Sequence, residues 1–253
     1  MSTETLTSVE KSINILKALG NPPYEFKVQE LSDLLNINRT SVYRILKILE
    51  SNGVVVNDPN SNKYKVGSEL YHLGVSYLYH NNYGNQIQDI LAEISDLTRE
   101  SVGLAIKDRD KIMSIFEVEI HQPMKLNDTP GKYFPVNKGC YGKCIMAYQD
   151  ADYINNYLDN NTFEKTAPNV ITEKEELLKE YSKIRENGYV LSTDELGFEI
   201  VGVGIPLFSN DGKIKACVAV AFYRYDDYEQ RQLKFKDILL EYKSTLEQYL
   251  PTL

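Results

Sequence analysis

The stretch that most constrains the fold is residues 28–53, which has the pattern of two short helices joined by a tight turn. Apolar residues recur at spacings of three and four along both segments, as they do in a helix that packs on one side only. These positions are Leu31, Leu34 and Leu35 in the first segment, Ile37 in the turn, and Val42, Ile45, Leu46 and Leu49 in the second. Asn52 and Gly53 supply a C-terminal cap. The stretch therefore predicts a helix-turn-helix.

The second helix begins with a run of hydrogen-bonding side chains that includes two arginines. The run consists of Asn38, Arg39, Thr40, Ser41, Tyr43 and Arg44. A helix that enters the major groove of DNA needs such a start, because side chains read base edges while arginine, hydroxyl and backbone N–H groups meet phosphates. We expect Arg39 to read a base, since arginine is the common bidentate partner of guanine, and Arg44 to contact a phosphate. Two alternatives stay open: Thr40 or Ser41 could cap the helix, and Tyr43 could pack against the core.

The segments on either side complete a winged helix-turn-helix. A first helix is predicted over residues 9–19, with one apolar face made of Val9, Ile13, Leu16 and Leu19. Residues 54–66 contain a β-branched segment, a run of turn-forming residues and a segment of alternating polarity, which together predict a hairpin. We expect Lys63 and Lys65, on the second strand of this wing, to meet the phosphate backbone of DNA.

The net charge of −8 argues at first against a DNA-binding protein, but the charge is unevenly distributed. Residues 1–80 carry eight basic and eight acidic side chains, so the excess of acid belongs entirely to residues 81–253. Within residues 38–65, five basic side chains stand against two acidic ones, which gives this stretch a net charge of +3. The predicted DNA-reading segment is therefore locally basic, as contact with phosphates requires.

The rest of the chain predicts an α+β domain in which an antiparallel sheet is flanked by helices. Residues 69–79 predict a linker helix, and we place the domain boundary near residue 82. Further helices are expected over residues 87–99, 140–148, 152–158, 173–186 and 227–250. Strands are expected over residues 101–106, 111–118, 124–127, 201–208 and 214–222, with a loop over residues 131–138. Gly202 and Gly204, inside a strand pattern, indicate the close approach of another part of the backbone.

Sequence signals for catalysis and for metal binding are weak. The chain has no G-x-S-x-G, P-loop or H-E-x-x-H motif. Cys140 and Cys144 share one face of a predicted helix and could begin a metal site. The remaining ligands would have to be His121 or Cys217, and buried small hydrophobic residues are the favoured interpretation. A nucleophilic Cys140 would need His121 as its base. We therefore expect no enzyme, no metal and no cofactor.

The location of the protein follows from what the sequence contains. No run approaches the roughly 18 to 20 apolar residues of a membrane-spanning helix. The polar first twelve residues lack the apolar core of a signal sequence. Three cysteines in a chain of this length argue against a disulfide framework and for a reducing compartment. We therefore expect a cytoplasmic protein with no membrane partner.

Three stretches, taken in order, resemble the IclR family of transcriptional regulators over nearly the whole chain. The first comprises SVEKSINILKAL, ELSDLLNINRTSVYRILKILESNGVV and KYKVGSELYHLG. The second is PGKYFPVNKGCYGKCIMAY, and the third is RENGYVLSTDELGFEIVGVGIPLF followed by NDGKIKACVAVAF. The resemblance implies a winged helix-turn-helix DNA-binding domain over residues 1–67 and a dimerising linker helix over residues 68–85. It also implies a GAF-like effector-binding and oligomerisation domain over residues 86–253.

By the same resemblance, the effector pocket is lined by Leu126, Phe134, Cys140, Tyr141, Ser192, Gly202, Ala219 and Ala221. Members that bind small organic acids often have a small pair such as Gly-Ala at Cys140 and Tyr141. They also have an acidic residue near Ser192, and hydroxyls near Ala219 and Ala221. Methyl groups in place of hydroxyls remove hydrogen-bond partners, and each unmatched polar group of a ligand costs about 1–3 kcal/mol.

We therefore expect an effector that is more apolar or aromatic than a short keto acid, or a pocket partly filled by Tyr141. One feature favours an acid, because the helix that begins near Cys140 would direct its positive end and its backbone N–H groups at the cavity.

The resulting prediction is a sequence-specific DNA-binding transcriptional regulator whose operator binding is modulated by a small-molecule effector. It would act on double-stranded DNA as a homodimer or a dimer of dimers, and its two-fold symmetry would set the spacing of the half-sites. Two other classes stay open: a small-molecule-processing enzyme with an appended DNA-binding domain, and a protein-interaction scaffold.

Overall fold

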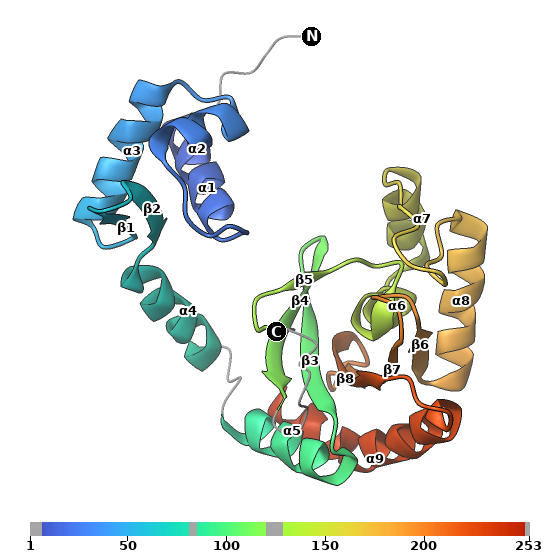
Figure 1. Cartoon of the computed structure of the whole chain (residues 1–253). Coiled ribbons are helices and arrows are strands. Elements are labelled where there is room, and N and C mark those ends of the chain that lie inside the picture. Colours follow the sequence, from blue (N-terminus) through green and yellow to red (C-terminus); the bar gives the residue numbers. More distant parts are fainter. Residues whose placement is uncertain (1–6, 81–84, 120–128, 251–253) are drawn as a thin grey trace. The chain divides into compact units, whose positions relative to one another are not determined.

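Figure 1 shows the computed structural model, which describes residues 7–80, 85–119 and 129–250. The chain divides into two units, Met1–Asn81 and Asn82–Leu253, each with its own core. The strand candidate at residues 124–127 lies outside the described residues. The mixed α+β fold class and the helix-turn-helix are as the sequence predicts.

The N-terminal unit consists of three helices, a hairpin and a fourth helix. These elements are α1 (Ser8–Leu19), α2 (Val28–Leu35), α3 (Arg39–Ser51), β1 (Val55–Asp58), β2 (Lys63–Val66) and α4 (Ser68–His80). The strands β1 and β2 pair in antiparallel register, and Phe26 forms a bridge to Tyr64 on β2. The core of this unit combines all three helices with the hairpin, and its buried residues are Ile15, Leu19, Leu31, Ile37, Val42, Leu46, Val55 and Tyr64.

The turn between α2 and α3 is held by local hydrogen bonds. Asn36 ends α2 in the left-handed conformation, with φ of 51°. The hydroxyl of Ser32 donates to the carbonyl of Ile37 at 2.7 Å. Asn38 is the N-cap of α3, because its Oδ1 accepts from the N–H of Thr40 at 2.9 Å. The alternative that Thr40 or Ser41 caps this helix is therefore wrong, since both residues lie inside its first turn.

The apolar face predicted for α1 is buried only in part, and α4 also exposes apolar side chains. On α1, Ile15 and Leu19 are buried, whereas Val9 is 69% exposed and Ile13 is 44% exposed. The predicted face of α1 is wrong to that extent, because the residues that contact the core lie on a neighbouring stripe. On α4, Leu73 is 54% exposed. Apolar periodicity cannot distinguish burial within one chain from a face that another molecule could cover.

The C-terminal unit is built around a six-stranded antiparallel sheet of order β5-β4-β3-β8-β7-β6. Its strands are β3 (Ser101–Asp108), β4 (Lys111–Val118), β5 (Tyr133–Phe134), β6 (Val190–Thr193), β7 (Ile200–Phe208) and β8 (Ile214–Tyr223). Its helices are α5 (Asn85–Thr98), α6 (Gly139–Ala147), α7 (Ala151–Asp159), α8 (Lys174–Asn187) and α9 (Tyr228–Tyr249). The sequence did not predict β6, and it predicted a loop where the short β5 lies.

Large and small residues alternate along the central strands and give the sheet two different faces. The large side chains of β7, such as Val201 and Val203, lie on the face that α5 and α9 cover (Figure 1). Phe222 of β8 meets Phe235 of α9 there, with ring centroids 5.3 Å apart. The opposite face, under α6, carries small residues: Ser101, Gly103, Ala105, Ser192, Gly202, Gly204, Cys217, Ala219 and Ala221.

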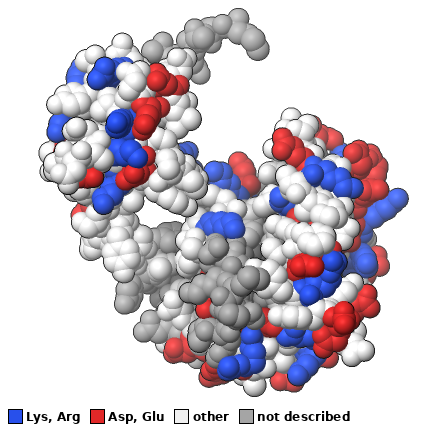
Figure 2. Space-filling model, viewed as in Figure 1, with Lys and Arg blue, Asp and Glu red and all other residues white. Residues whose placement is uncertain are grey.

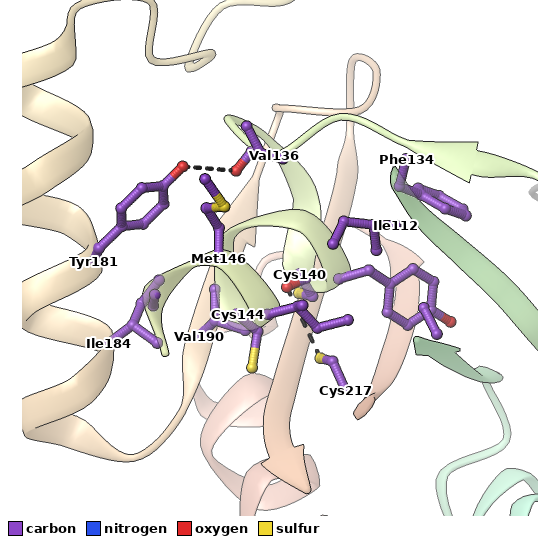
Figure 3. Close-up of a cluster of buried hydrophobic side chains, with 14 of the residues drawn as sticks. Ile112, Phe134, Val136, Cys140, Cys144, Met146, Tyr181, Ile184, Val190 and Cys217 are labelled. Carbon is purple, nitrogen blue, oxygen red and sulfur yellow. Dashed lines mark hydrogen bonds between the residues drawn. The ribbon is translucent and has the colours of Figure 1, made fainter. Parts of the chain in front are cut away.

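This face of small residues lets α6 approach the sheet closely. A Cβ atom on Gly202 would lie 2.9 Å from Cys140 Sγ, and one on Gly204 would lie 3.1 Å from Cys140 Cβ. A close approach at these two glycines is therefore present, although the nearest atoms belong to the side chain of Cys140 rather than to backbone. The helices α7 and α8 contribute buried residues to the core around α6. Tyr181 of α8 donates there to the carbonyl of Val136 at 3.1 Å (Figure 3).

Replacing Gly142 of α6 with alanine is expected to lower the free energy of unfolding by about 3 kcal/mol, the upper range for overpacking. The added Cβ would lie 1.8 Å from the carbonyl oxygen of Pro135, and backbone cannot move aside as a flexible side chain can. Urea unfolding of the full chain measures the change. Gly197→Ala is the matched control, because its Cβ would meet only the flexible side chain of Ile200, whose terminal methyl would lie 2.9 Å away. Equal losses in the two variants would contradict the prediction.

Candidate nucleic-acid interface and small-molecule pocket

The start of α3 forms an exposed polar surface. Asn38, Arg39, Thr40, Tyr43 and Arg44 are exposed and Ser41 is half-buried. Tyr43 is 49% exposed, and Lys47 Nζ lies 5.8 Å from its ring centroid, so Tyr43 does not pack in the core. The first N–H groups of a helix have no partners within the helix, and the helix dipole makes this end positive. The surface can therefore accept phosphates and present side chains to base edges.

The two wing lysines differ in their surroundings. Lys63 Nζ lies 2.7 Å from Glu25 Oε1, and the hydrogen bond to Glu25 raises the pKa of Lys63 above its ordinary value. Lys65 is exposed. A phosphate contact by Lys63 would have to compete with Glu25, so Lys65 is the better placed of the two.

A groove between α1 and α3 adds residues that sequence reasoning missed. Its volume is about 170 Å³, and it is lined by Ser8, Lys11, Ser12, Ser41, Arg44, Ile45, Ile48 and Leu49. Lys11 and Arg44 therefore border the same groove from different helices. The spacing of Ser8, Lys11 and Ser12 by three and four residues is the signal in the sequence that could have identified this face. Figure 2 shows that basic and acidic side chains are interspersed over the face it displays.

Seven of the eight predicted effector residues line one cavity under α6. They are Phe134, Cys140, Tyr141, Ser192, Gly202, Ala219 and Ala221, and Leu126 lies outside the described residues. The cavity also contacts residues that were not predicted: Ser101, Gly103, Glu117, Glu119, Leu196, Ile200, Val201 and Val220. Its volume is only about 30 Å³, enough for a few water molecules but not for an organic ring.

Tyr141 accounts for the small size of the cavity. Its ring packs edge-on against Phe134, with centroids 4.9 Å apart and an interplanar angle of 83°. Its hydroxyl donates to the carboxylate of Glu117, at 3.1 Å from Oε1 and 3.3 Å from Oε2. A Cβ atom on Gly103 would lie 2.1 Å from both the hydroxyl of Tyr141 and Glu117 Oε2, so only glycine leaves room for this pair. In this structure the side chain of Tyr141 therefore occupies part of the space beneath α6.

The start of α6 already binds a carboxylate of the chain itself. The N–H of Gly139, the first residue of α6, donates to Glu195 Oε2 at 2.7 Å. Glu195 Oε1 lies 2.6 Å from the ammonium of Lys143, which also contacts Glu180 Oε1 and the carbonyl of Leu191, both at 2.9 Å. The positive N-terminal end of α6, which was expected to favour an acidic ligand, is thus partly neutralised by the carboxylate of Glu195.

Lys143 is only 1% exposed and carries its charge into the core. Burial alone lowers its pKa, but the charges of Glu195 and Glu180 outweigh that effect and hold the pKa above its ordinary value. The sequence alone did not predict this cluster of Lys143, Glu180 and Glu195. Its members come from α6, α8 and the segment after β6, which are distant in the chain.

The three cysteines are free thiols in the core. Cys217 Sγ lies 3.8 Å from the carbonyl oxygen of Cys140 (Figure 3). Burial raises the pKa of Cys140 and of Cys217, which disfavours the reactive thiolate. Among the described residues, no group of three or more His, Cys, Asp or Glu side chains is arranged to hold a metal ion, and His121 lies outside them.

The helices of the described part of the chain include none that is both long enough and apolar enough to cross a membrane.

Comparison with known proteins covers both units. Residues 8–59 match the IclR helix-turn-helix domain, and residues 75–246 match the C-terminal domain of the bacterial transcriptional regulator IclR. The transcriptional regulator KdgR of Escherichia coli is 26% identical over 93% of this chain and 89% of its own length. An IclR transcriptional regulator from Alicyclobacillus acidocaldarius superposes with a TM-score of 0.84 and 25% identity, over 97% of this chain and 99% of that chain.

A more distant structure carries a bound small molecule. The IclR homologue of Microbacterium hydrocarbonoxydans, complexed with 4-hydroxybenzoate, superposes with a TM-score of 0.80 over 96% of this chain and the whole of that chain. At 12% identity, this likeness concerns the fold alone.

Proposed function

Because this chain belongs to the IclR family of bacterial transcriptional regulators, we propose that α3 reads an operator in the major groove and that a small molecule bound under α6 modulates this binding. The protein is a DNA-binding transcriptional regulator with a C-terminal effector-binding domain. The roles of individual residues are the proposal. The main support for the effector site is that seven of the positions implied by the family resemblance line one cavity.

The proposed DNA interface centres on the exposed start of α3. In this proposal Arg39 reads a base, and Arg44 contacts the DNA backbone together with Lys11, which borders the same groove. Lys65 of the wing would contact a flanking phosphate, while Lys63 contributes less because Glu25 already binds it. Asn38, Thr40, Ser41 and Tyr43 complete the surface, with Asn38 also capping the helix.

We assign residues 1–67 to DNA binding, residues 68–85 to a dimerising linker and residues 86–253 to effector binding and further assembly. Apolar side chains exposed on α4 support the linker assignment, since a second copy of the chain could cover them. They include Tyr71, Leu73 and Tyr77, which are 78%, 54% and 42% exposed. A two-fold arrangement would place two copies of α3 on the half-sites of a palindromic operator.

Replacing Leu73 with glutamate is expected to shift the protein from dimers or larger assemblies to monomers. A charge placed in an apolar interface loses water without gaining a partner. Sedimentation velocity at micromolar concentration measures the assembly. His72→Glu is the control, because it adds the same charge at an exposed position on the same helix. If Leu73→Glu sediments as the wild type does, α4 is not the interface.

Two rival functions are less well supported. A cysteine-dependent enzyme would need a reactive thiolate, and burial raises the pKa of Cys140, which favours the unreactive thiol. The relatives are transcriptional regulators, which argues against a catalytic role. A protein-interaction scaffold would not need the basic and hydroxyl-rich start of α3. We therefore propose no catalytic activity.

Selection of bound sequences from a random double-stranded DNA library tests the proposed function. The wild-type chain should enrich a palindrome whose half-sites lie about one helical turn, or a multiple of it, apart. Thermal-shift screening of small molecules, followed by operator titrations with and without each hit, tests the effector role. Failure to enrich any sequence would contradict the DNA function, and hits that leave operator affinity unchanged would contradict the coupling.

A further inference from the structure

The cavity under α6 contains a buried hydroxyl that the described part of the chain leaves unsatisfied. Ser101 is 3% exposed, and its Oγ has no hydrogen-bond partner within the described residues. It lies on β3 two residues from Gly103, so both face the same cavity. Buried polar groups are normally hydrogen-bonded, so this hydroxyl calls for a partner inside the cavity, which is water while the site is empty and a ligand when one is bound.

The remaining polar groups of the wall mostly accept hydrogen bonds. A carboxylate such as Glu117 accepts only, and the single proton of the Tyr141 hydroxyl is directed to Glu117. Glu119 is a second carboxylate in the wall, and the wall as described contains no lysine or arginine. The first N–H of α6 donates to Glu195. A ligand that brings hydrogen-bond donors therefore matches this wall better than one that brings a carboxylate.

Tyr141 indicates the shape of such a ligand. Its ring fills the space beside Phe134 while its hydroxyl binds Glu117, so a phenol is held there by the chain itself. The free cavity of about 30 Å³ cannot accept a second ring, so a ligand must take the place of this side chain. An occupant with a ring and a hydroxyl would restore both contacts and could also reach Ser101.

We propose that the effector of this protein is an uncharged phenol or aromatic alcohol, which displaces the Tyr141 side chain and places its own hydroxyl on Glu117. The proposal rests on the proposed function of the pocket and names the ligand class. Tyr141 then acts as a built-in competitor that keeps the site closed until the effector is present. Phe134 packs against the ligand ring, and Ser101 gains the hydrogen bond that it lacks.

Three probes of one shape test the ligand class: 4-methylphenol, 4-methylbenzoate and toluene. Isothermal titration calorimetry and thermal shift of the full-length wild type should show 4-methylphenol binding at least tenfold tighter than the other two. Tyr141→Phe should bind 4-methylphenol tighter than the wild type, because it removes the competing hydroxyl while keeping the ring. Tyr141→Ala should bind it tighter still, since it leaves a cavity of the probe's shape, and Tyr225→Ala, at a 53% exposed tyrosine, should behave as the wild type.

Replacement of Glu117 with glutamine should remove the preference for 4-methylphenol over toluene, whereas Glu164→Gln, at an exposed position, should preserve it. Tighter binding of 4-methylbenzoate, or no binding of 4-methylphenol by the wild type up to its solubility, would overturn the proposal. So would unchanged 4-methylphenol affinity in both Tyr141 variants. Binding of each protein to its selected DNA site is measured in parallel. If the wild type binds its operator but prefers 4-methylbenzoate or toluene, only the proposed ligand class is refuted. If the wild type binds no operator, the proposed function is refuted.

Discussion

Replacing Arg39 and Arg44 together with alanine is expected to weaken binding to the selected operator by at least about 100-fold. Discrimination by one bidentate arginine–base contact is worth about 1–3 kcal/mol, and removal of a phosphate contact adds to the loss. The single variants should differ in kind. Arg39→Ala should relax the sequence preference at one base pair, whereas Arg44→Ala should weaken all sequences alike and reduce the salt slope by about 1. Fluorescence anisotropy titrations at several salt concentrations measure both effects.

Lys234→Ala is the control for this experiment, because Lys234 is an exposed cation on α9 of the other unit. The substitution removes one positive charge and leaves the residues of α3 unchanged, so both the operator affinity and the salt slope should stay near the wild-type values. Circular dichroism should show that the double variant retains its helices, since both arginines are exposed. Unchanged operator affinity in the double variant would mean that α3 does not read the operator.

The DNA-reading half of the chain is accessible from sequence because its signals are local. The turn at Ile37, the apolar spacing of α3 and the basic charge of its start all lie within one short stretch. The identity of the N-cap was missed, because Asn38, Thr40 and Ser41 are all good capping residues and only the backbone geometry distinguishes them. The exposed Val9 and Ile13 of α1 were assigned to the core for a similar reason, since spacing does not say what covers a face.

In the C-terminal unit, site residues could be predicted from sequence only at positions that a family motif marks. Seven carried-over residues converge on the cavity, yet Ser101, Gly103 and Glu117 were not identified. Their proximity depends on the register of β3 against β4 and β8, where Gly103 pairs with both Glu117 and Ala219. A shift by one residue would turn each side chain to the opposite face of the sheet. No single-strand pattern contains that information.

Replacing Lys143 with methionine is expected to lower the free energy of unfolding by about 3–5 kcal/mol, the usual cost of removing one partner from a buried ion pair. Methionine has a similar length and is apolar, so the loss would come from the carboxylates of Glu195 and Glu180 rather than from a cavity. The side chain of Glu195 is 8% exposed, and burial raises its pKa, so without its cation it would have to keep an unpaired buried charge or bind a proton, and both cost free energy. Urea unfolding at neutral pH measures the change, and Lys183→Met, at an exposed position of α8, should change little.

The dependence of this loss on pH follows from the direction of the Lys143 shift. Its pKa in the folded protein lies above the ordinary value of 10.5, so the charged form is favoured by folding. With Glu195 and Glu180 ionised, the stabilisation is therefore fully present from neutral pH to about pH 10 and disappears as the pH rises through the folded pKa. The gap in stability between the wild type and Lys143→Met should narrow in strongly alkaline solution, after subtraction of the change seen in Lys183→Met.

A second variant separates the buried charge from lost packing. Adding Glu195→Gln to Lys143→Met should recover part of the stability, because glutamine removes the unpaired charge while its amide oxygen can still accept from the N–H of Gly139. Glu195 places a negative charge at the start of α6, and the positive charge of Lys143 offsets the cost of burying that carboxylate. If the double variant is less stable than Lys143→Met, the cluster stabilises the unit through packing and hydrogen-bond geometry, and the argument from charge fails.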